Sequence, residues 1–134
     1  MPVFYILVNM FEALQIMLLG IQPVAKIDGK TLERIIHREF GNYVSEVKQK
    51  LKGVVSATQN GKNRISAAII KLADKDINAI DNFIEISNND FRDVLLRAEY
   101  PGCFDLEFDE LEKAEMKQIY LADWKDYSNW LNKT

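Results

Sequence analysis

The sequence is poor in the residues that build metal centres, disulfides and tight turns. Its 134 residues include one cysteine, Cys103, and one histidine, His37. A single cysteine excludes an intrachain disulfide and a cysteine-based zinc site, and a single histidine excludes sites that need two. With 6 glycines and 3 prolines, a β-sandwich of many short strands and turns is also disfavoured.

The length and composition are those of one globular domain. The chain is 48% hydrophobic and 28% charged, close to the average for folded proteins, and domains most often contain roughly 100–150 residues. Residues 1–134 are therefore predicted to form a single domain. The sequence has no glycine-rich phosphate loop, no His-Glu-x-x-His, no nucleophile elbow and no calcium loop, so it predicts no cofactor and no metal site.

The most apolar part of the chain is residues 3–21, where fifteen of nineteen positions are apolar. A helix of this length would measure about 29 Å, close to the ~30 Å core of a bilayer. Glu12 near its centre would cost at least about 2.5 kcal/mol on insertion, and no basic residue precedes the run. We expect a mainly helical, buried element; a self-association surface and a membrane or signal segment are the alternatives. Residues 3–8 also have the composition of a short strand.

Apolar side chains recur every three or four positions over residues 31–56, which predicts one long helix. The stripe consists of Leu32, Ile36, Phe40, Tyr43, Val47, Leu51 and Val54. Gly41 falls outside the stripe, so the helix is predicted to run through it to about Ser56, continuous or slightly kinked, with Asp28 or Thr31 as its cap.

The same spacing predicts helices over residues 62–73, 77–87, 90–100 and 115–131. Asn60 and Gly61 are expected to interrupt the chain, and Asp74 or Asp76 to cap the helix that follows. The last helix carries an apolar stripe of Met116, Tyr120, Trp124, Tyr127 and Leu131. Asp123 is predicted to be the polar partner of its phenol or indole groups. The fold class is therefore all-α: a compact bundle of five or six helices, with a possible short N-terminal strand.

Polar residues that could bind a ligand or partner are densest on the 90–100 helix. Asp93 and Arg97 are four positions apart and can pair, whereas Arg92 and Glu99 share a side seven positions apart. The face predicted to be buried consists of Phe91, Val94, Leu95 and Ala98. Leu96 and Tyr100 point away from it, toward a second packed side or an exposed patch. The candidate binding residues are Asp90, Arg92, Asp93, Leu96, Glu99 and Tyr100, with helix capping and surface ion pairs as the alternative role. No residue is assigned a catalytic role.

Charge is unevenly distributed along this acidic chain. Residues 26–71 carry ten basic and four acidic side chains, a net +6, whereas residues 88–134 carry six basic and eleven acidic, a net −5. The two segments either complement each other or present separate faces to partners. A basic cluster of Lys48, Lys50, Lys52, Lys62 and Arg64 could contact phosphates, but no aromatic residue is interleaved for base stacking. Nucleic-acid binding is therefore disfavoured.

These features predict a small, cytoplasmic, non-enzymatic helical protein that binds an unknown protein partner or itself. One alternative is a membrane-associated protein anchored by residues 3–21. Another is a small-ligand-binding or enzymatic domain that uses the 90–100 helix. His37 is predicted to be a hydrogen-bonded histidine at the edge of the core, and Cys103 an inert thiol.

Overall fold

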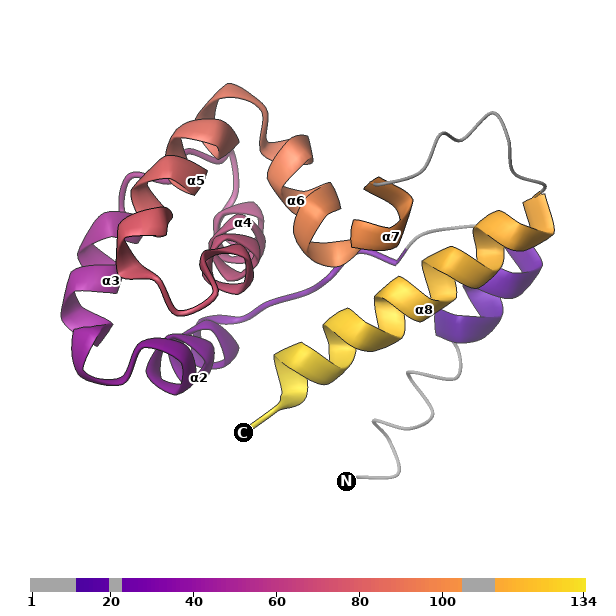
Figure 1. Cartoon of the computed structure of the whole chain (residues 1–134), viewed down its shortest axis with the longest axis horizontal. Coiled ribbons are helices and arrows are strands. Elements are labelled where there is room, and N and C mark those ends of the chain that lie inside the picture. Colours follow the sequence, from indigo (N-terminus) through magenta and orange to yellow (C-terminus); the bar gives the residue numbers. More distant parts are fainter. Residues whose placement is uncertain (1–11, 20–22, 105–112) are drawn as a thin grey trace.

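Helix α4 (Gln59–Ala73) lies at the centre of the bundle in the computed structural model, which describes residues 12–19, 23–104 and 113–134. It packs against α2 (Gly29–Phe40), α5 (Ile77–Asn89) and α6 (Phe91–Glu99) (Figure 1). Six consecutive residues of α4, 65–70, are buried, as expected of a helix covered on all sides. Ala67 and Ala68 are fully buried, and their small side chains take little space between the helices.

The prediction of a single helix over residues 31–56, continuous or slightly kinked, is wrong. The chain forms α2, a short 3₁₀ helix η1 (Gly41–Tyr43) and then α3 (Val44–Leu51). Gly41 has φ 47° and ψ −108°, a conformation that side chains strongly disfavour, and this residue ends α2. The break rotates the second half of the apolar stripe, so Tyr43 is exposed while Val47, Leu51 and Val54 remain buried.

The pair Asn60-Gly61 was predicted to interrupt the chain, and this is wrong. Both residues lie in the first turn of α4. Thr58 caps this helix, because its side-chain oxygen accepts a hydrogen bond from the Gly61 N–H at 3.0 Å. A Cβ atom at Gly61 would lie 2.4 Å from Ser56 Oγ. The close approach of the Ser56 side chain therefore favours glycine here, and the residue does not mark a break.

Two aspartates position the helices that follow α4. Asp76 caps α5, as predicted, and accepts from the Asn78 N–H at 3.0 Å. Asp90 then ends α5 and caps α6 through the Arg92 N–H at 3.1 Å. Helix α6 packs against α4, α5 and α8 (Lys113–Asn132), and is followed by the short α7 (Pro101–Phe104). Because α6 lies between other helices, it is packed on two sides, which is the first of the two arrangements that the sequence allowed for Leu96 and Tyr100.

Helix α8 covers the predicted 115–131 helix and lies beside the helical residues 12–19 (Figure 1). Ile16 is buried, and Glu12 accepts a hydrogen bond from the Trp124 indole at 2.8 Å. The acid that argued against membrane insertion therefore has a partner on α8. Leu14, Leu18 and Leu19, on the same short helix, are exposed.

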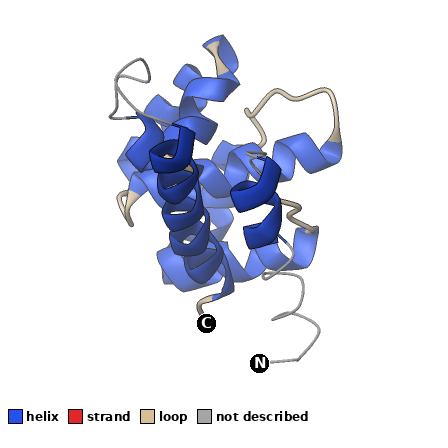
Figure 2. Cartoon of the chain, turned by 90° about the vertical axis from the view of Figure 1, so that its right-hand side faces the viewer, coloured by secondary structure: helices blue, strands red, loops and turns tan. Residues whose placement is uncertain are grey.

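The all-α class is confirmed, but the expected five or six helices are too few. The described residues contain seven α-helices, α2 to α8, and residues 12–19 are helical as well. The additional helices arise because Gly41 divides one predicted helix and because α7 stands apart from α6. The described residues contain no strand (Figure 2). The possible strand at residues 3–8 lies outside them, and none of the helices described is long and apolar enough to cross a membrane.

Candidate functional site

The start of α6 presents Asp90 and Arg92 to solvent. Asp90 Oδ1 accepts from the backbone N–H of Arg92 and, at 3.3 Å, from its guanidinium Nε. The Arg92 side chain is 81% exposed, so this pair is a surface contact that holds neither side chain rigidly.

Glu99, at the other end of α6, is a buried carboxylate with a dedicated partner. Glu99 is 1% exposed, and Arg64 of α4 donates to both of its carboxylate oxygens, at 2.9 and 2.7 Å. The hydrogen bond with Glu99 raises the pKa of the Arg64 guanidinium above its ordinary value. This bidentate pair joins α4 to α6.

Tyr100 follows directly and is buried as well. Its hydroxyl donates to the Pro23 carbonyl oxygen at 3.2 Å, and its ring stacks on Trp124 of α8 with 6.4 Å between centroids. Burial raises the pKa of this phenol above its ordinary range, and the neighbouring Glu99 carboxylate raises it further. Tyr100 therefore ties the segment before α2 to the junction of α6 and α8.

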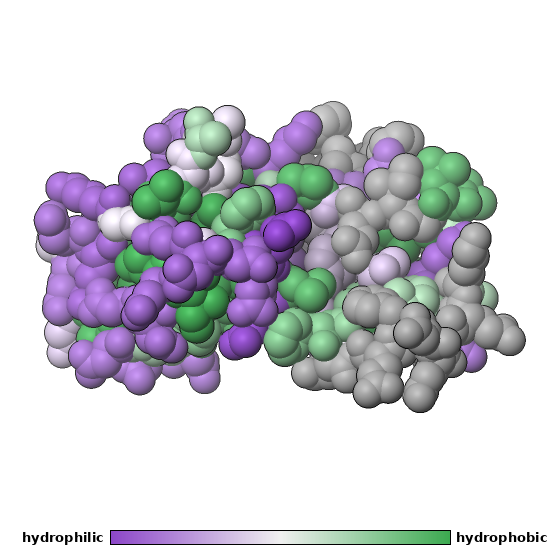
Figure 3. Space-filling model, turned by 90° about the horizontal axis from the view of Figure 1, so that it is seen from above, coloured by the Kyte–Doolittle hydropathy of each residue, from purple (hydrophilic) through white to green (hydrophobic). Residues whose placement is uncertain are grey.

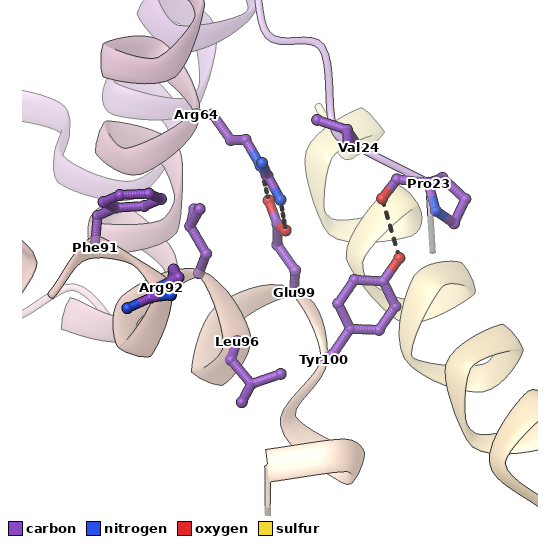
Figure 4. A pocket seen from close by; sticks show the side chains of 9 residues that line it. Pro23, Val24, Arg64, Phe91, Arg92, Leu96, Glu99 and Tyr100 are labelled. Carbon is purple, nitrogen blue, oxygen red and sulfur yellow. Dashed lines mark hydrogen bonds and ion pairs between the residues drawn. The ribbon is translucent and has the colours of Figure 1, made fainter. Parts of the chain in front are cut away.

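A pocket of about 310 Å³ opens between Pro23–Val24, α4 and α6 (Figure 4). Arg64 and Glu99 point toward one another across it, and the Tyr100 hydroxyl points toward Pro23. The Arg92 guanidinium points away from this pair. Leu96 also lines the pocket and lies below Glu99 in this view.

A larger pocket of about 750 Å³ adjoins the first and shares Arg64, Phe91, Arg92 and Leu95 with it. It lies between residues 55–57, the first turns of α4, the end of α5 and the start of α6. We call this larger pocket the α4–α6 groove. Ile65 and Leu95 of the core line it, and Phe91 and Val55 stand beside it with 49% and 71% of their surfaces exposed. Figure 3 shows apolar surface between hydrophilic atoms on the left half of the molecule, which carries α3, α4 and α5.

The structure gathers five of the six predicted site residues at these two pockets. Arg92, Leu96, Glu99 and Tyr100 line the smaller one, and Asp90 and Arg92 line the α4–α6 groove. Asp93 lines neither and pairs with Arg97 at 3.3 Å, as its spacing predicted. Phe91, predicted to face the core, instead stands beside the groove, because it begins α6 at the edge of the bundle.

Sequence reasoning missed the contributions of other elements to the site. Arg64 was assigned to a basic cluster, and nothing in the sequence pairs it with Glu99, 35 positions away. Pro23 and Val24 carry no signal that would place them beside α6. Val55 carried one signal: it is apolar and directly follows Val54, the last residue of the predicted stripe, without belonging to that stripe.

Asp123 was predicted to be a partner for aromatic hydroxyl or indole groups, and this is wrong. It accepts from the backbone N–H groups of Gly102 and Cys103, both at 3.1 Å, and so holds α7 against α8. The indoles bind other acids: Trp124 donates to Glu12, and Trp130 to Glu39.

The remaining polar residues flagged in the sequence have structural roles. The His37 ring is exposed and hydrogen-bonded to Glu33 at 3.1 Å. Cys103 is buried, and burial raises the pKa of its thiol to about 12 with a further contribution from Asp123. Within the described residues, no group of His, Cys, Asp and Glu side chains could hold a metal ion.

This arrangement can accommodate an apolar group more readily than it can transfer a proton. Glu99 is held by Arg64, and Asp90 is occupied as a helix cap.

Comparison with known proteins gives no further guidance, since no family model, no curated protein and no solved structure matches the chain.

Proposed function

We propose that the chain is a non-enzymatic protein-binding module whose partner inserts an aliphatic or aromatic side chain into the α4–α6 groove. The observation that carries this proposal is an accessible concavity of about 750 Å³ with core residues on its walls and Phe91 and Val55 exposed beside it. Large apolar side chains exposed around a concave site are typical of binding surfaces.

The charges around the two pockets support an uncharged inserted group. Two basic residues, Arg64 and Arg92, face two acidic ones, Glu99 and Asp90, and each is paired within the site. A charged group entering the groove would lose water without finding an unpaired counter-ion, which is unfavourable. An apolar side chain would instead bury the exposed faces of Phe91 and Val55.

Selection from a library of random 12-residue peptides tests the proposal directly. We expect peptides with one or two large apolar residues to be enriched, and their binding to be lost in Phe91→Asp. An acidic residue suits the first turn of a helix, so this variant is expected to fold. Tyr43→Asp is the matched control, because Tyr43 is an exposed aromatic residue outside both pockets. Enrichment that survives Phe91→Asp, or no enrichment at all, would contradict the proposal.

The proposal includes a cytoplasmic location, which the single buried, unpaired thiol supports.

Self-association and membrane association through residues 3–21 are the competing proposals. The exposure of Leu14, Leu18 and Leu19 supports both, whereas the bond from Trp124 to Glu12 favours docking on the chain's own α8. Residues 3–11 and 20–21 lie outside the described part of the chain.

A further inference from the structure

A third pocket, of about 340 Å³, lies on the opposite side of α4 from the α4–α6 groove, between α2, α3 and α4. The groove and this third pocket use opposite faces of α4: Gly61, Arg64 and Ile65 line the groove. Gln59, Lys62, Asn63 and Ser66 line the third pocket. We call it the lysine pocket, because Lys48 of α3, Lys52 directly after α3 and Lys62 of α4 lie on its wall.

Packing divides the basic cluster seen in the sequence into two groups. Lys50 pairs with Asp81 at 2.6 Å and Arg64 pairs with Glu99, so both are directed elsewhere. The other three members line one pocket, with Glu33 as the acid among them. Three lysines and one glutamate give this wall a net charge of +2.

Two of the three lysines have no acidic partner in the described part of the chain. Lys48 is bound to Glu33, and that hydrogen bond lowers the pKa of the glutamate. Lys52 and Lys62 line the pocket without such a contact. Like charges around one pocket repel each other, and an anion bound between them would relieve that repulsion.

Two further features favour an anion in the lysine pocket. Ser66 is 2% exposed and lines the pocket, yet its hydroxyl makes no hydrogen bond within the residues described. The Ser66 oxygen is not one of the fully buried, unpartnered polar atoms of the described residues, so it stays in contact with solvent in the pocket and a ligand can reach it. Gln59, the first residue of the 15-residue α4, also lies on the wall, and the neutral Thr58 cap leaves the positive end of the helix dipole unopposed.

Apart from Gly29 and from Asn63, whose amide donates to the Ile27 carbonyl oxygen, the rest of the pocket is aliphatic, and this indicates the uncharged part of a ligand. Leu32, Ile36 and Leu51 line it, and no aromatic residue does. We propose that the lysine pocket binds a small soluble phosphate monoester with an apolar body. The phosphate contacts Lys52, Lys62 and the Ser66 hydroxyl, and the apolar body packs on the leucines and Ile36. Without an aromatic ring on the wall, a nucleic acid would find no stacking surface.

Calorimetric titration of the full chain with phenyl phosphate tests this proposal. We expect saturable binding that weakens by about tenfold or more in Lys52→Gln/Lys62→Gln, which removes two charge-assisted contacts. Ser66→Ala is expected to weaken binding by about three- to tenfold. The control Lys125→Gln/Lys133→Gln removes the same charge from exposed positions outside the pocket and should change the dissociation constant by less than about twofold.

Three comparisons can overturn the proposal. Benzyl alcohol binding as tightly as phenyl phosphate would show that the phosphate is not recognised. An oligonucleotide that binds without being displaced by phenyl phosphate would make the basic face a nucleic-acid surface. Binding to phosphatidic acid vesicles without binding to soluble phenyl phosphate would assign the site to a lipid headgroup. Phe91→Asp should leave phenyl phosphate binding unchanged, so failure here is distinguishable from failure of the protein-binding proposal.

Discussion

The ion pair between Arg64 and Glu99 shows how one residue contact joins two parts of this fold. Glu99 is almost completely buried, whereas Arg64 is about one-fifth exposed. A carboxylate at such a depth is tolerated because both of its oxygens accept hydrogen bonds from the guanidinium. The pair also forms part of the wall of the smaller pocket.

Replacing Arg64 by leucine is expected to lower the free energy of unfolding by about 3–5 kcal/mol, because Glu99 would be left as a buried, unpaired charge. The double variant Arg64→Leu/Glu99→Leu should recover most of this loss. Arg92→Leu is the control, since the exposed pair of Arg92 with Asp90 contributes less than about 1 kcal/mol. Urea unfolding followed by circular dichroism measures all three, and equal losses in Arg64→Leu and Arg92→Leu would contradict this account.

Cys103 is expected to be unreactive while the protein is folded. Its folded pKa of about 12 lies above the ordinary value of 9.0, so the folded thiol keeps its proton at a pH where the unfolded thiol loses it. Unfolding then releases a proton, and the free energy of unfolding falls as the pH rises from about 9 toward 12. Labelling with iodoacetamide near pH 9 should be much faster in urea than in buffer. Equal rates would show that the thiol is accessible in the native state.

At the scale of elements, the two glycines at the ends of α2 differ in backbone conformation but not in the space around them. Gly29 begins the helix and Gly41 follows it. A Cβ atom at either position would meet nothing within 4 Å, but Gly41 has φ 47° and Gly29 has no such restriction. The bend between α2 and α3 therefore depends on backbone conformation at one residue.

The variant Gly41→Ala is expected to lose about 1–3 kcal/mol of stability, because alanine is strained in this backbone conformation. Gly29→Ala should be neutral or more stable by up to about 1 kcal/mol, since alanine restricts the unfolded chain without strain in the helix. Thermal unfolding of the two variants compares them. If Gly41→Ala were as stable as Gly29→Ala, residues 40–44 would not have the backbone described.

At the scale of the whole molecule, arginines of α2 hold the carboxyl end of α8. Arg34 donates to the Leu131 carbonyl, and Arg38 donates to those of Trp130, at 2.8 Å, and Lys133. The Arg38 guanidinium also lies 4.9 Å from the centroid of the Trp130 ring. Cations at a helix carboxyl end are favoured by its dipole. These contacts are one place where the basic and acidic halves of the chain meet.

Replacing Arg38 by glutamine is expected to loosen α8 more than α4. The loss of the carbonyl contacts and of the ring contact should cost about 1–3 kcal/mol, concentrated over residues 120–132. Hydrogen exchange measured by mass spectrometry can compare these residues with α4. Arg34→Gln, which removes a more exposed arginine, serves as the control and should have a smaller effect. A uniform increase in exchange would indicate that α8 does not open separately.

Much of the helical structure and part of the site could be predicted because their causes are local. The period of apolar residues located α4, α5, α6 and α8, and the predicted cap Asp76 acts within two residues of itself. The pairing of Asp93 with Arg97 is equally local. The site itself was only half visible, since Arg92, Leu96, Glu99 and Tyr100 were identified without the elements that face them.

The sequence by itself determined where helices form and which of their faces are apolar, because those properties depend on residues a few positions apart. Only the tertiary structure decided that Arg64 meets Glu99 and that Asp123 binds the amides of α7. It also decided that three lysines converge on one pocket. Such contacts join residues tens of positions apart, and they follow from the angles at which helices pack, which a helical period does not encode.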